Sequence, residues 1–369
     1  MTPGRAPAQV LVVDDSAVQR RFLRAAVEAD GDLTVVSEAS NGRDAVALVA
    51  RLRPAVVLMD LDLPVMGGLE AIERIMSASP TAILVYSAFV TGSSSANGVA
   101  ALAAGAVDVL AKPGPDDSGT LGEYAAELRR SLRVAARVRV ITHPRGRLRS
   151  AAMAGAASSL AGTDRRPLAP ARCRAAVQPV SLLVLGASTG GPQALLAVLR
   201  ALPADLEQAV LVVQHMADGF LPGLAAWLDG MVALPVCVGS SGTRLAPGTV
   251  TLAPSGGNFL VQDDRLRVLS SAPGPGQLHV PGIDECLTSV ADALGPAAIG
   301  VLLTGMGRDG AAGLLALRRR GALTLTQDEA TSAVYGMPAA AVALDAVDAQ
   351  LPLCELAPAL LRAVGRDPG

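Results

Sequence analysis

The chain has 369 residues, of which 51% are hydrophobic, and its formal net charge is −2. This length predicts two or three domains, and the near-neutral charge gives no global attraction to nucleic acid. No apolar run approaches the roughly 18 residues of a membrane span, and the N-terminus lacks the apolar core of a signal peptide. Four scattered cysteines, none in a Cys-x-x-Cys pair, argue against a zinc site and a disulfide framework. We therefore expect a cytoplasmic protein without membrane insertion.

The first third of the chain alternates short apolar strands with amphipathic helices. The expected strands cover residues 10–13, 33–37, 55–59, 82–86 and 107–110, with helices between them. This alternation predicts an α/β domain with a doubly wound parallel sheet. We assign residues 8–125 to it.

Polar residues stand at or just past the ends of these strands. They are Asp14, Asp15, Asp60, Ser87 and Lys112. The carboxyl ends of parallel strands form the edge at which open α/β sheets bind ligands. Three carboxylates there would repel one another without a divalent cation, and Mg²⁺ takes oxygen ligands. The pattern favours phosphoryl transfer onto a carboxylate over five unrelated surface residues.

Lys112 is the only lysine among the 31 basic residues, the rest being arginines. A compact ammonium and a planar guanidinium are not interchangeable. We therefore expect position 112 to need a point charge that pairs with phosphoryl oxygens.

The motifs of this domain resemble those of the receiver domains of two-component response regulators. They are Val-Val-Asp-Asp-Ser at 12–16, Met-Asp-Leu-Asp-Leu-Pro-Val-Met-Gly-Gly at 59–68, Ser-Ala at 87–88 and Lys-Pro at 112–113. The resemblance implies a flavodoxin-like fold and a sensor histidine kinase as phosphodonor. It also implies site roles: Asp60 as phosphoacceptor, Asp14, Asp15 and Asp60 as Mg²⁺ ligands, and Ser87 and Lys112 as switch residues.

Two positions depart from that pattern. Gly67 stands where such domains often carry Asp or Asn, and Val109 stands where an aromatic switch residue is common. We expect phosphoryl chemistry to survive both changes. Because position 109 carries no aromatic ring, the signalling of phosphorylation through an aromatic rotamer is in doubt.

Residues 126–178 are rich in Arg, Ala and Gly and predict a linker, at whose start residues 123–140 can form a helix. Twelve arginines lie between Arg129 and Arg174, against one acid, Asp164. The composition favours a solvated tether over docking to an acidic partner or nucleic acid. No aromatic residues are interleaved for base stacking.

Residues 179–365 again alternate apolar strands and helices, which predicts a second α/β domain with a parallel sheet. The expected strands include residues 182–185, 209–213, 250–254, 259–261, 266–269, 298–303 and 322–326, with helices over 193–201 and 311–320.

The first of these strands ends in a Gly-rich turn, Gly-Ala-Ser-Thr-Gly-Gly at 186–191. Its first five residues match the Gly-x-Ser-x-Gly pattern, which lifts Ser188 onto a tight strand-to-helix turn as a nucleophile. A helix cap or a phosphate-binding loop would explain the same residues.

His215 and Asp309 each follow another buried strand, so both can reach the edge that carries Ser188. A serine nucleophile needs a base, and the base needs an acid that fixes its tautomer. His279 ranks well behind His215 because it lies in a loop rich in Gly and Pro. Asp284 and Asp328 are weaker candidates for the acid. The turns around Met306 and Thr189 could supply the backbone N–H groups of an oxyanion hole.

The motifs of this domain look like those of the chemotaxis protein-glutamate methylesterases, which pair an N-terminal receiver with such a domain. They are Gly-Ala-Ser-Thr-Gly-Gly at 186–191, Gln-His-Met at 214–216, Leu-Thr-Gly-Met-Gly-Arg-Asp-Gly at 303–310 and the run at 327–338. The resemblance implies Ser188 as nucleophile, His215 as base, Asp309 as orienting acid and the Met306 N–H as oxyanion donor. It implies glutamyl methyl esters of chemoreceptor cytoplasmic domains as substrates, and glutamine deamidation as a second activity.

The loops that face a substrate depart from that family. Val-Pro-Gly-Ile-Asp at 280–284 stands where Arg-Pro-Ser-Val-Asp is usual, and Asn258 stands where a His is common. Residues 217–220 replace a run like Pro-Pro-Gly-Phe. These changes put the receptor partner in doubt, and they leave the triad intact.

The sequence therefore predicts a serine esterase that is activated by phosphorylation. Unphosphorylated, the receiver should obstruct the Ser188 edge, and phosphorylation of Asp60 should loosen it. A DNA-binding response regulator would need a helix-turn-helix module after the receiver, and the sequence offers none. A nucleotide-binding module using the turn at Gly186 would need an acid after the next strand, where Gln214 and His215 stand.

Overall fold

The computed structural model describes residues 6–88, 93–113, 121–138 and 179–367, apart from residues 218, 276 and 278. The chain forms two compact units, divided between Arg165 and Arg166. Most of the predicted linker, from residue 139 onward, lies outside the described residues, and so do the arginines that it carries there. Within the described ranges, no helix is long and apolar enough to cross a membrane.

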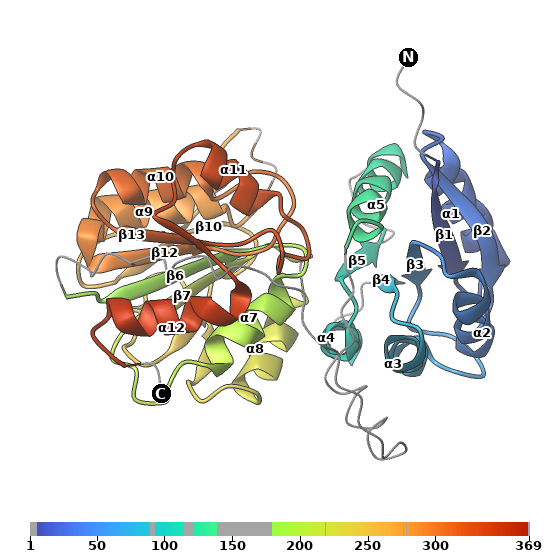
Figure 1. The fold of residues 1–369 in the computed structure, drawn as a ribbon, viewed down its shortest axis with the longest axis horizontal. Coiled ribbons are helices and arrows are strands. Elements are labelled where there is room, and N and C mark those ends of the chain that lie inside the picture. The colour runs from blue at the N-terminus through green and yellow to red at the C-terminus, as the bar shows by residue number, and fades with distance from the viewer. Residues whose placement is uncertain are drawn as a thin grey trace, which may run out of the picture. The chain divides into compact units, whose positions relative to one another are not determined.

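The first unit alternates strands and helices along the chain (Figure 1). Its elements are β1 (Ala8–Val13), α1 (Ala17–Glu28), β2 (Leu33–Ala39), α2 (Gly42–Leu52), β3 (Val56–Met59), α3 (Gly68–Ala78), β4 (Ala82–Ala88), α4 (Ser93–Ala104), β5 (Asp108–Lys112) and α5 (Leu121–Ala135). The strands form one parallel sheet in the order β2-β1-β3-β4-β5. The predicted doubly wound, flavodoxin-like fold is confirmed.

Local sequence signals begin the first two helices. The Ser16 side chain accepts a hydrogen bond from the Gln19 N–H, and the Asn41 side chain accepts one from the Asp44 N–H. Each side chain satisfies a backbone donor that the first helical turn leaves unpaired. These caps fix where the helices leave the strand ends that carry the polar residues.

Helix α5 extends the first unit beyond the predicted boundary at residue 125. It continues to Ala135, and Leu128 and Leu132 are buried in one core with the sheet and α1. The helix itself was expected, over residues 123–140, and only its assignment to the linker was wrong. Residues 126–135 are therefore part of the core of the first unit and not of a linker.

Two of the arginines assigned to the tether hold this helix in place. The Arg129 Nε lies 2.9 Å from Asp30, and the Arg133 Nε lies 2.6 Å from Asp32. The two arginines therefore join α5 to the turn between α1 and β2.

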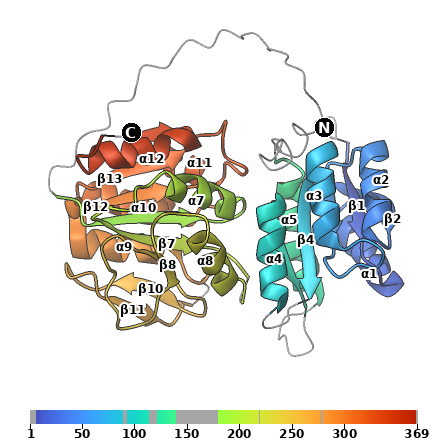
Figure 2. The same cartoon turned by 90° about the horizontal axis from the view of Figure 1, so that it is seen from below.

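The second unit also alternates strands and helices, with a small hairpin inserted. Its elements are β6 (Leu182–Ala187), α7 (Gly191–Arg200), β7 (Ala209–Gln214), α8 (Leu221–Asp229), β8 (Val236–Val238), β9 (Val250–Leu252), β10 (Asn258–Val261), β11 (Val268–Ser271), α9 (Ile283–Leu294), a 3₁₀ turn (Gly295–Ala297), β12 (Ala298–Leu302), α10 (Ala311–Arg319), β13 (Leu323–Gln327), α11 (Met337–Ala343), β14 (Ala349–Leu351) and α12 (Leu353–Ala363). Helices α9 and α10 cover one face of the sheet, and α7 and α12 cover the other (Figures 1 and 2).

The seven strands of this sheet are parallel and run in the order β14-β13-β12-β6-β7-β9-β8. From β6 the chain first builds outward through β7 and later returns to place β12 on the other side of β6. The strand order therefore reverses at β6, which makes its carboxyl end a crevice where ligands bind in such sheets.

The predicted α/β class of the second unit is confirmed, with one difference in detail. Residues 258–261 and 268–271 pair as an antiparallel hairpin, β10–β11, which lies outside the parallel sheet. This hairpin packs beside α9 (Figure 2). It thus brings Asn258 toward the start of that helix.

We predict that Leu132→Ala lowers the free energy of unfolding of the first unit by about 2–5 kcal/mol, because it opens a cavity in the core. Leu121→Ala is the matched control on the same helix, since Leu121 is 64% exposed. Chemical denaturation followed by circular dichroism measures both variants. Equal small losses would contradict the packing of α5 on the sheet.

Candidate functional site

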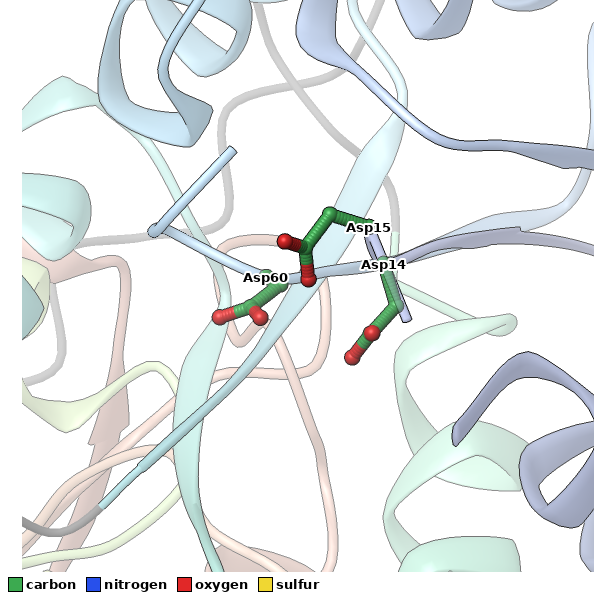
Figure 3. Close-up of side chains that lie close together, drawn as sticks. All are labelled: Asp14, Asp15 and Asp60. Atoms are coloured by element: carbon green, nitrogen blue, oxygen red, sulfur yellow. The ribbon is translucent and has the colours of Figure 1, made fainter. Parts of the chain in front are cut away.

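The first unit gathers its predicted polar residues where its strand order reverses, between β1 and β3. Asp14 and Asp60 follow these two strands directly and are buried, while Asp15 is exposed. Ligand oxygens of the three carboxylates lie within 4.8 Å of one another. Figure 3 shows their side chains grouped around one space.

Lys112, the last residue of β5, joins two of these carboxylates. Its Nζ lies 2.7 Å from Oδ2 of Asp14 and 2.5 Å from Oδ2 of Asp60. Burial works against its charge, but these two contacts raise the pKa of Lys112 overall. Ser87 is buried near the end of β4. The structure thus brings all five predicted residues to one sheet edge.

Asp60 is held by both charge and backbone contacts. Its Oδ1 accepts a 2.7 Å hydrogen bond from the Leu61 N–H. Burial raises its pKa most strongly, the contact with Lys112 opposes this rise, and the charge of Asp14 adds to it, so the pKa is raised overall. A carboxylate that is buried beside another one is costly to keep ionised without a further cation.

In the second unit, Ser188, His215 and Asp309 follow β6, β7 and β12, the three strands at the reversal point. The His215 N–H donates to the Ala187 carbonyl at 2.9 Å, and the Ser188 N–H donates to the Thr304 carbonyl at 3.1 Å. These bonds continue the sheet pairing past the strand ends. The backbone therefore carries the predicted nucleophile, base and acid to one edge.

His215 and Asp309 are in direct contact. Nε2 of the imidazole lies 2.9 Å from Oδ2 of the carboxylate, and both side chains are largely buried. Both ring nitrogens are buried without an aligned hydrogen bond among the described residues, so the Nε2 contact is a close approach and not a well-directed hydrogen bond. Since Nε2 lies against the acid, Nδ1 is the nitrogen that would have to take a proton from Ser188.

The first turn of α9 holds the Asp309 carboxylate. The Ile283 N–H donates to Oδ2 and the Asp284 N–H donates to Oδ1, each at 2.9 Å, and the Gly310 N–H donates to Oδ1 at 2.9 Å. Burial raises the pKa of Asp309, but the contact with His215 and these N–H donors outweigh it and lower the pKa below 3.8. The acid is thus kept ionised beside the imidazole.

The competing acids from the sequence have other contacts. The Asp284 carboxylate accepts a 2.7 Å hydrogen bond from the Gly313 N–H, and Asp328 accepts from the Thr331 N–H at 3.0 Å. Asp284 still contributes to the site, but through its backbone N–H. Asp309 is the acid that meets His215.

The turns proposed for the oxyanion hole are packed against each other. The Thr304 hydroxyl donates to the Thr189 carbonyl at 3.0 Å, and the Gly305 N–H donates to the Val334 carbonyl at 3.0 Å. The Gly305 donor is thus already used, so the oxyanion donor of this turn would have to be the N–H of Met306 or Gly307, of which the family resemblance implies Met306. A Cβ at position 305 would lie 2.7 Å from the Ser188 Cβ, so only glycine permits this approach.

Two side chains at this edge were not predicted to matter. The Gln214 amide donates to the Ser188 carbonyl at 3.0 Å and to the His215 carbonyl at 2.6 Å, so it joins the turns of β6 and β7. The His279 ring stacks on the His215 ring, with centroids 4.5 Å apart and planes 16° from parallel. We expected poor positioning for His279, and that expectation was wrong. Its loop is fixed by hydrogen bonds between side chains far apart in sequence, which composition does not reveal.

Comparison with known proteins matches both units. The family model described as response regulator receiver domain matches residues 10–120, and the one described as CheB methylesterase matches residues 183–360. A protein-glutamate methylesterase/protein-glutamine glutaminase of Paramagnetospirillum magneticum is 42% identical over all of this chain and 99% of its own length. A protein of the same description from Anaeromyxobacter dehalogenans is 45% identical over 97% of each chain. A crystal structure of the Thermotoga maritima CheB methylesterase catalytic domain is 30% identical, covers 49% of this chain and 96% of its own, and has a TM-score of 0.47.

We predict that Asp60→Asn raises the free energy of unfolding of the first unit at neutral pH. A carboxyl whose folded pKa is raised binds more protons in the native state than in the unfolded state. The free energy of unfolding therefore falls as the pH rises from 3.8 through the raised pKa of Asp60. The side-chain amide of Asn does not ionise, so the variant does not lose this stability.

Chemical denaturation of both proteins at pH 7 without divalent cations measures the effect. Asp62→Asn, at an exposed acid in the same loop, should change little. A loss of stability in Asp60→Asn would show that its contact with Lys112 outweighs burial and the repulsion from Asp14.

Proposed function

The chain belongs to the protein-glutamate methylesterase/protein-glutamine glutaminase family, and on that premise we propose that Ser188, His215 and Asp309 form its catalytic triad. The observation that carries this proposal is the His215–Asp309 contact at the crevice of the parallel sheet, with Ser188 on the adjacent strand end. The reaction is hydrolysis of glutamyl methyl esters on chemoreceptors, in chemotactic adaptation.

In the proposed mechanism the Ser188 hydroxyl oxygen attacks the ester carbonyl carbon as Nδ1 of His215 takes its proton. Asp309 stabilises the resulting imidazolium, and the N–H groups of Met306 and of the turn at Thr189 receive the developing oxyanion. His215 then returns the proton to the methoxide as the carbon–oxygen bond breaks, which releases methanol. Water attacks the acyl-enzyme by the same route and leaves a glutamate.

The same geometry serves glutamine deamidation, in which ammonia replaces methanol as the leaving group. The imidazolium that forms on attack is placed to protonate the nitrogen before the C–N bond breaks. The relatives are described as both methylesterases and glutaminases, which supports this second activity here.

The receiver's acidic edge suits Mg²⁺, because its donors are three carboxylates, the oxygen ligands that this hard cation prefers. We propose that Asp14, Asp15 and Asp60 hold it. Bound there, Mg²⁺ would neutralise charge on the incoming phosphoryl group. An oxygen of the Asp60 carboxylate would attack phosphorus as the bond from phosphorus to the donor's imidazole nitrogen breaks, and Lys112 would exchange its contact with Asp60 for the phosphoryl oxygens. Ser87, buried on the next strand, would respond to the new group.

The donor of that phosphoryl group is proposed to be a sensor histidine kinase, and the substrate to be a methylated chemoreceptor cytoplasmic domain. Family membership supports both in general terms. The departures at Asn258, Val280 and Gly282 leave the particular receptor open. We further propose that the unphosphorylated receiver obstructs the Ser188 edge and that phosphorylation of Asp60 relieves this.

We predict that Ser188→Ala abolishes methanol release from a methylated receptor fragment. Asp309→Asn should lower kcat by roughly 10³- to 10⁴-fold, because an amide no longer fixes the imidazole tautomer or stabilises its charge. Asp292→Asn, at an exposed acid paired with Arg320, should leave the rate unchanged. Retained activity in Ser188→Ala would overturn the assignment of the nucleophile.

We predict that an acyl phosphate with Mg²⁺ raises the esterase rate of the whole protein by at least tenfold. Omission of Mg²⁺ or the Asp60→Asn substitution should remove the increase, because no phosphoryl group is then held at the switch. The rate of Asp62→Asn should still rise. Equal rates with and without phosphodonor in the wild-type protein would refute the gating.

A further inference from the structure

Asn258, the first residue of β10, and Gln277, in the loop after β11, form a reciprocal amide pair. The Asn258 Nδ2 donates to the Gln277 Oε1 at 2.9 Å, and the Gln277 Nε2 donates to the Asn258 Oδ1 at 2.7 Å. Asn258 is buried. We call these two side chains the amide clasp.

The clasp also binds the backbone of the loop at three points. The Gly274 N–H donates to the Gln277 Oε1 at 3.0 Å, the Gln277 Nε2 donates to the His279 carbonyl at 2.8 Å, and the Gly282 N–H donates to the Asn258 Oδ1 at 2.8 Å. The two amides therefore bind the backbone of the described residues Gly274, His279 and Gly282, in a part of the chain rich in Gly and Pro.

Two of these points lead directly to the triad. His279 carries the ring that stacks on His215. Gly282 is the residue before α9, whose first two N–H groups hold the Asp309 carboxylate. The clasp thus touches the supports of both members of the His215–Asp309 pair, and it contacts neither member itself.

Gly282 lies against the clasp. A Cβ at position 282 would lie 2.5 Å from the Gln277 Nε2 and would overlap the Glu285 carboxylate, so these two flexible side-chain ends would have to move. The Ser expected at 282 and the His expected at 258 are both replaced in this chain. The two departures therefore fit one local arrangement and need not be separate changes in substrate preference.

We propose that the amide clasp is a positioning device for the esterase reaction, which keeps the His215 imidazole in its productive plane through the stacked ring of His279. Asn258 and Gln277 are positioning residues. The ring of His279 restricts the tilt of His215, so that Nε2 stays on Asp309 and Nδ1 stays available to Ser188. A shift of about 1 Å in such a group costs up to roughly 100-fold in rate.

This inference rests on the proposed function, and two readouts on the full-length protein separate the two. One is kcat and KM for methanol release from a methylated receptor fragment. The other is the rate constant for labelling of Ser188 by a fluorophosphonate, which needs the triad and not the receptor. The variants are Asn258→Leu, Gln277→Leu, their double variant, His279→Ala and His279→Phe.

We expect each clasp variant to lower kcat and the labelling rate constant by about 10- to 100-fold, with KM within about twofold of wild type. The double variant should be no slower than the slower single variant, because the two amides act as one unit. His279→Ala should match the clasp variants. His279→Phe should stay within about threefold of wild type, because a planar ring remains to stack on His215.

Asp263→Ala is the matched control, since Asp263 fixes the turn at the opposite end of the same hairpin, and it should retain wild-type values. Three results would overturn the proposal: a raised KM with unchanged kcat, additive effects of the two leucine substitutions, or His279→Phe as slow as His279→Ala. If circular dichroism shows that Asn258→Leu does not fold, the rates of Gln277→Leu and of the two His279 variants test the proposal instead. If the wild-type protein releases no methanol, the proposed function fails, and the labelling rates still test the clasp.

Discussion

The carboxylate of Asp309 is the point on which the catalytic unit depends. The turn after β12 supplies it, the first turn of α9 binds it through two N–H groups, and the imidazole after β7 contacts it. These segments are far apart in sequence and meet only because the strand order reverses at β6. Hydrogen bonds to the ionised form compensate for the burial of this charge, so fold and site stabilise each other here.

In each unit a buried carboxylate lies at the sheet edge where the strand order reverses, and the pKa values of these two carboxylates are shifted in opposite directions. Asp309 accepts several N–H donors and faces a base, and its pKa is lowered. Asp60 has a strong backbone donor in Leu61, but it also faces Asp14 and is buried, and its pKa is raised despite Lys112. One carboxylate is thus stabilised as an anion, whereas the other is left short of positive charge. That shortage suits a residue that is to receive a cation and a phosphoryl group.

The sequence predicted the strand ends well, and much of the site with them. Buried parallel strands are continuous apolar runs, and the residues directly after such runs lie at one edge of the sheet. That rule located Asp14, Asp60, His215 and Asp309 without knowledge of their contacts. It says nothing about which strand neighbours which, so the position of β6 at the reversal point came only from the structure.

The misses share a different physical origin. A helix over residues 123–140 was expected but was assigned mostly to the linker, because its apolar stripe, Leu128 and Leu132, lies among arginines and alanines that suggest a tether. His279 was ranked behind His215, and His215 is indeed the histidine that contacts Asp309. The expectation that His279 would be poorly positioned overlooked the side-chain amide of Gln277, which binds its backbone. In both cases the decisive contacts join residues distant in sequence. A local pattern records what a segment can form by itself, and not what another segment holds in place.

The hydrogen bonds around Asn258 and Gly282 also bear on which methyl ester this enzyme accepts as its substrate. The family resemblance marks Asn258, Val280 and Gly282 alike as departures from the usual motifs. In the structure, Asn258 and Gly282 are buried and hydrogen-bonded to each other, so a receptor helix has no direct access to their polar groups. Val280 is only half-buried and stands where the family resemblance implies an arginine. Of the three departures, Val280 is therefore the one whose side chain a receptor can reach.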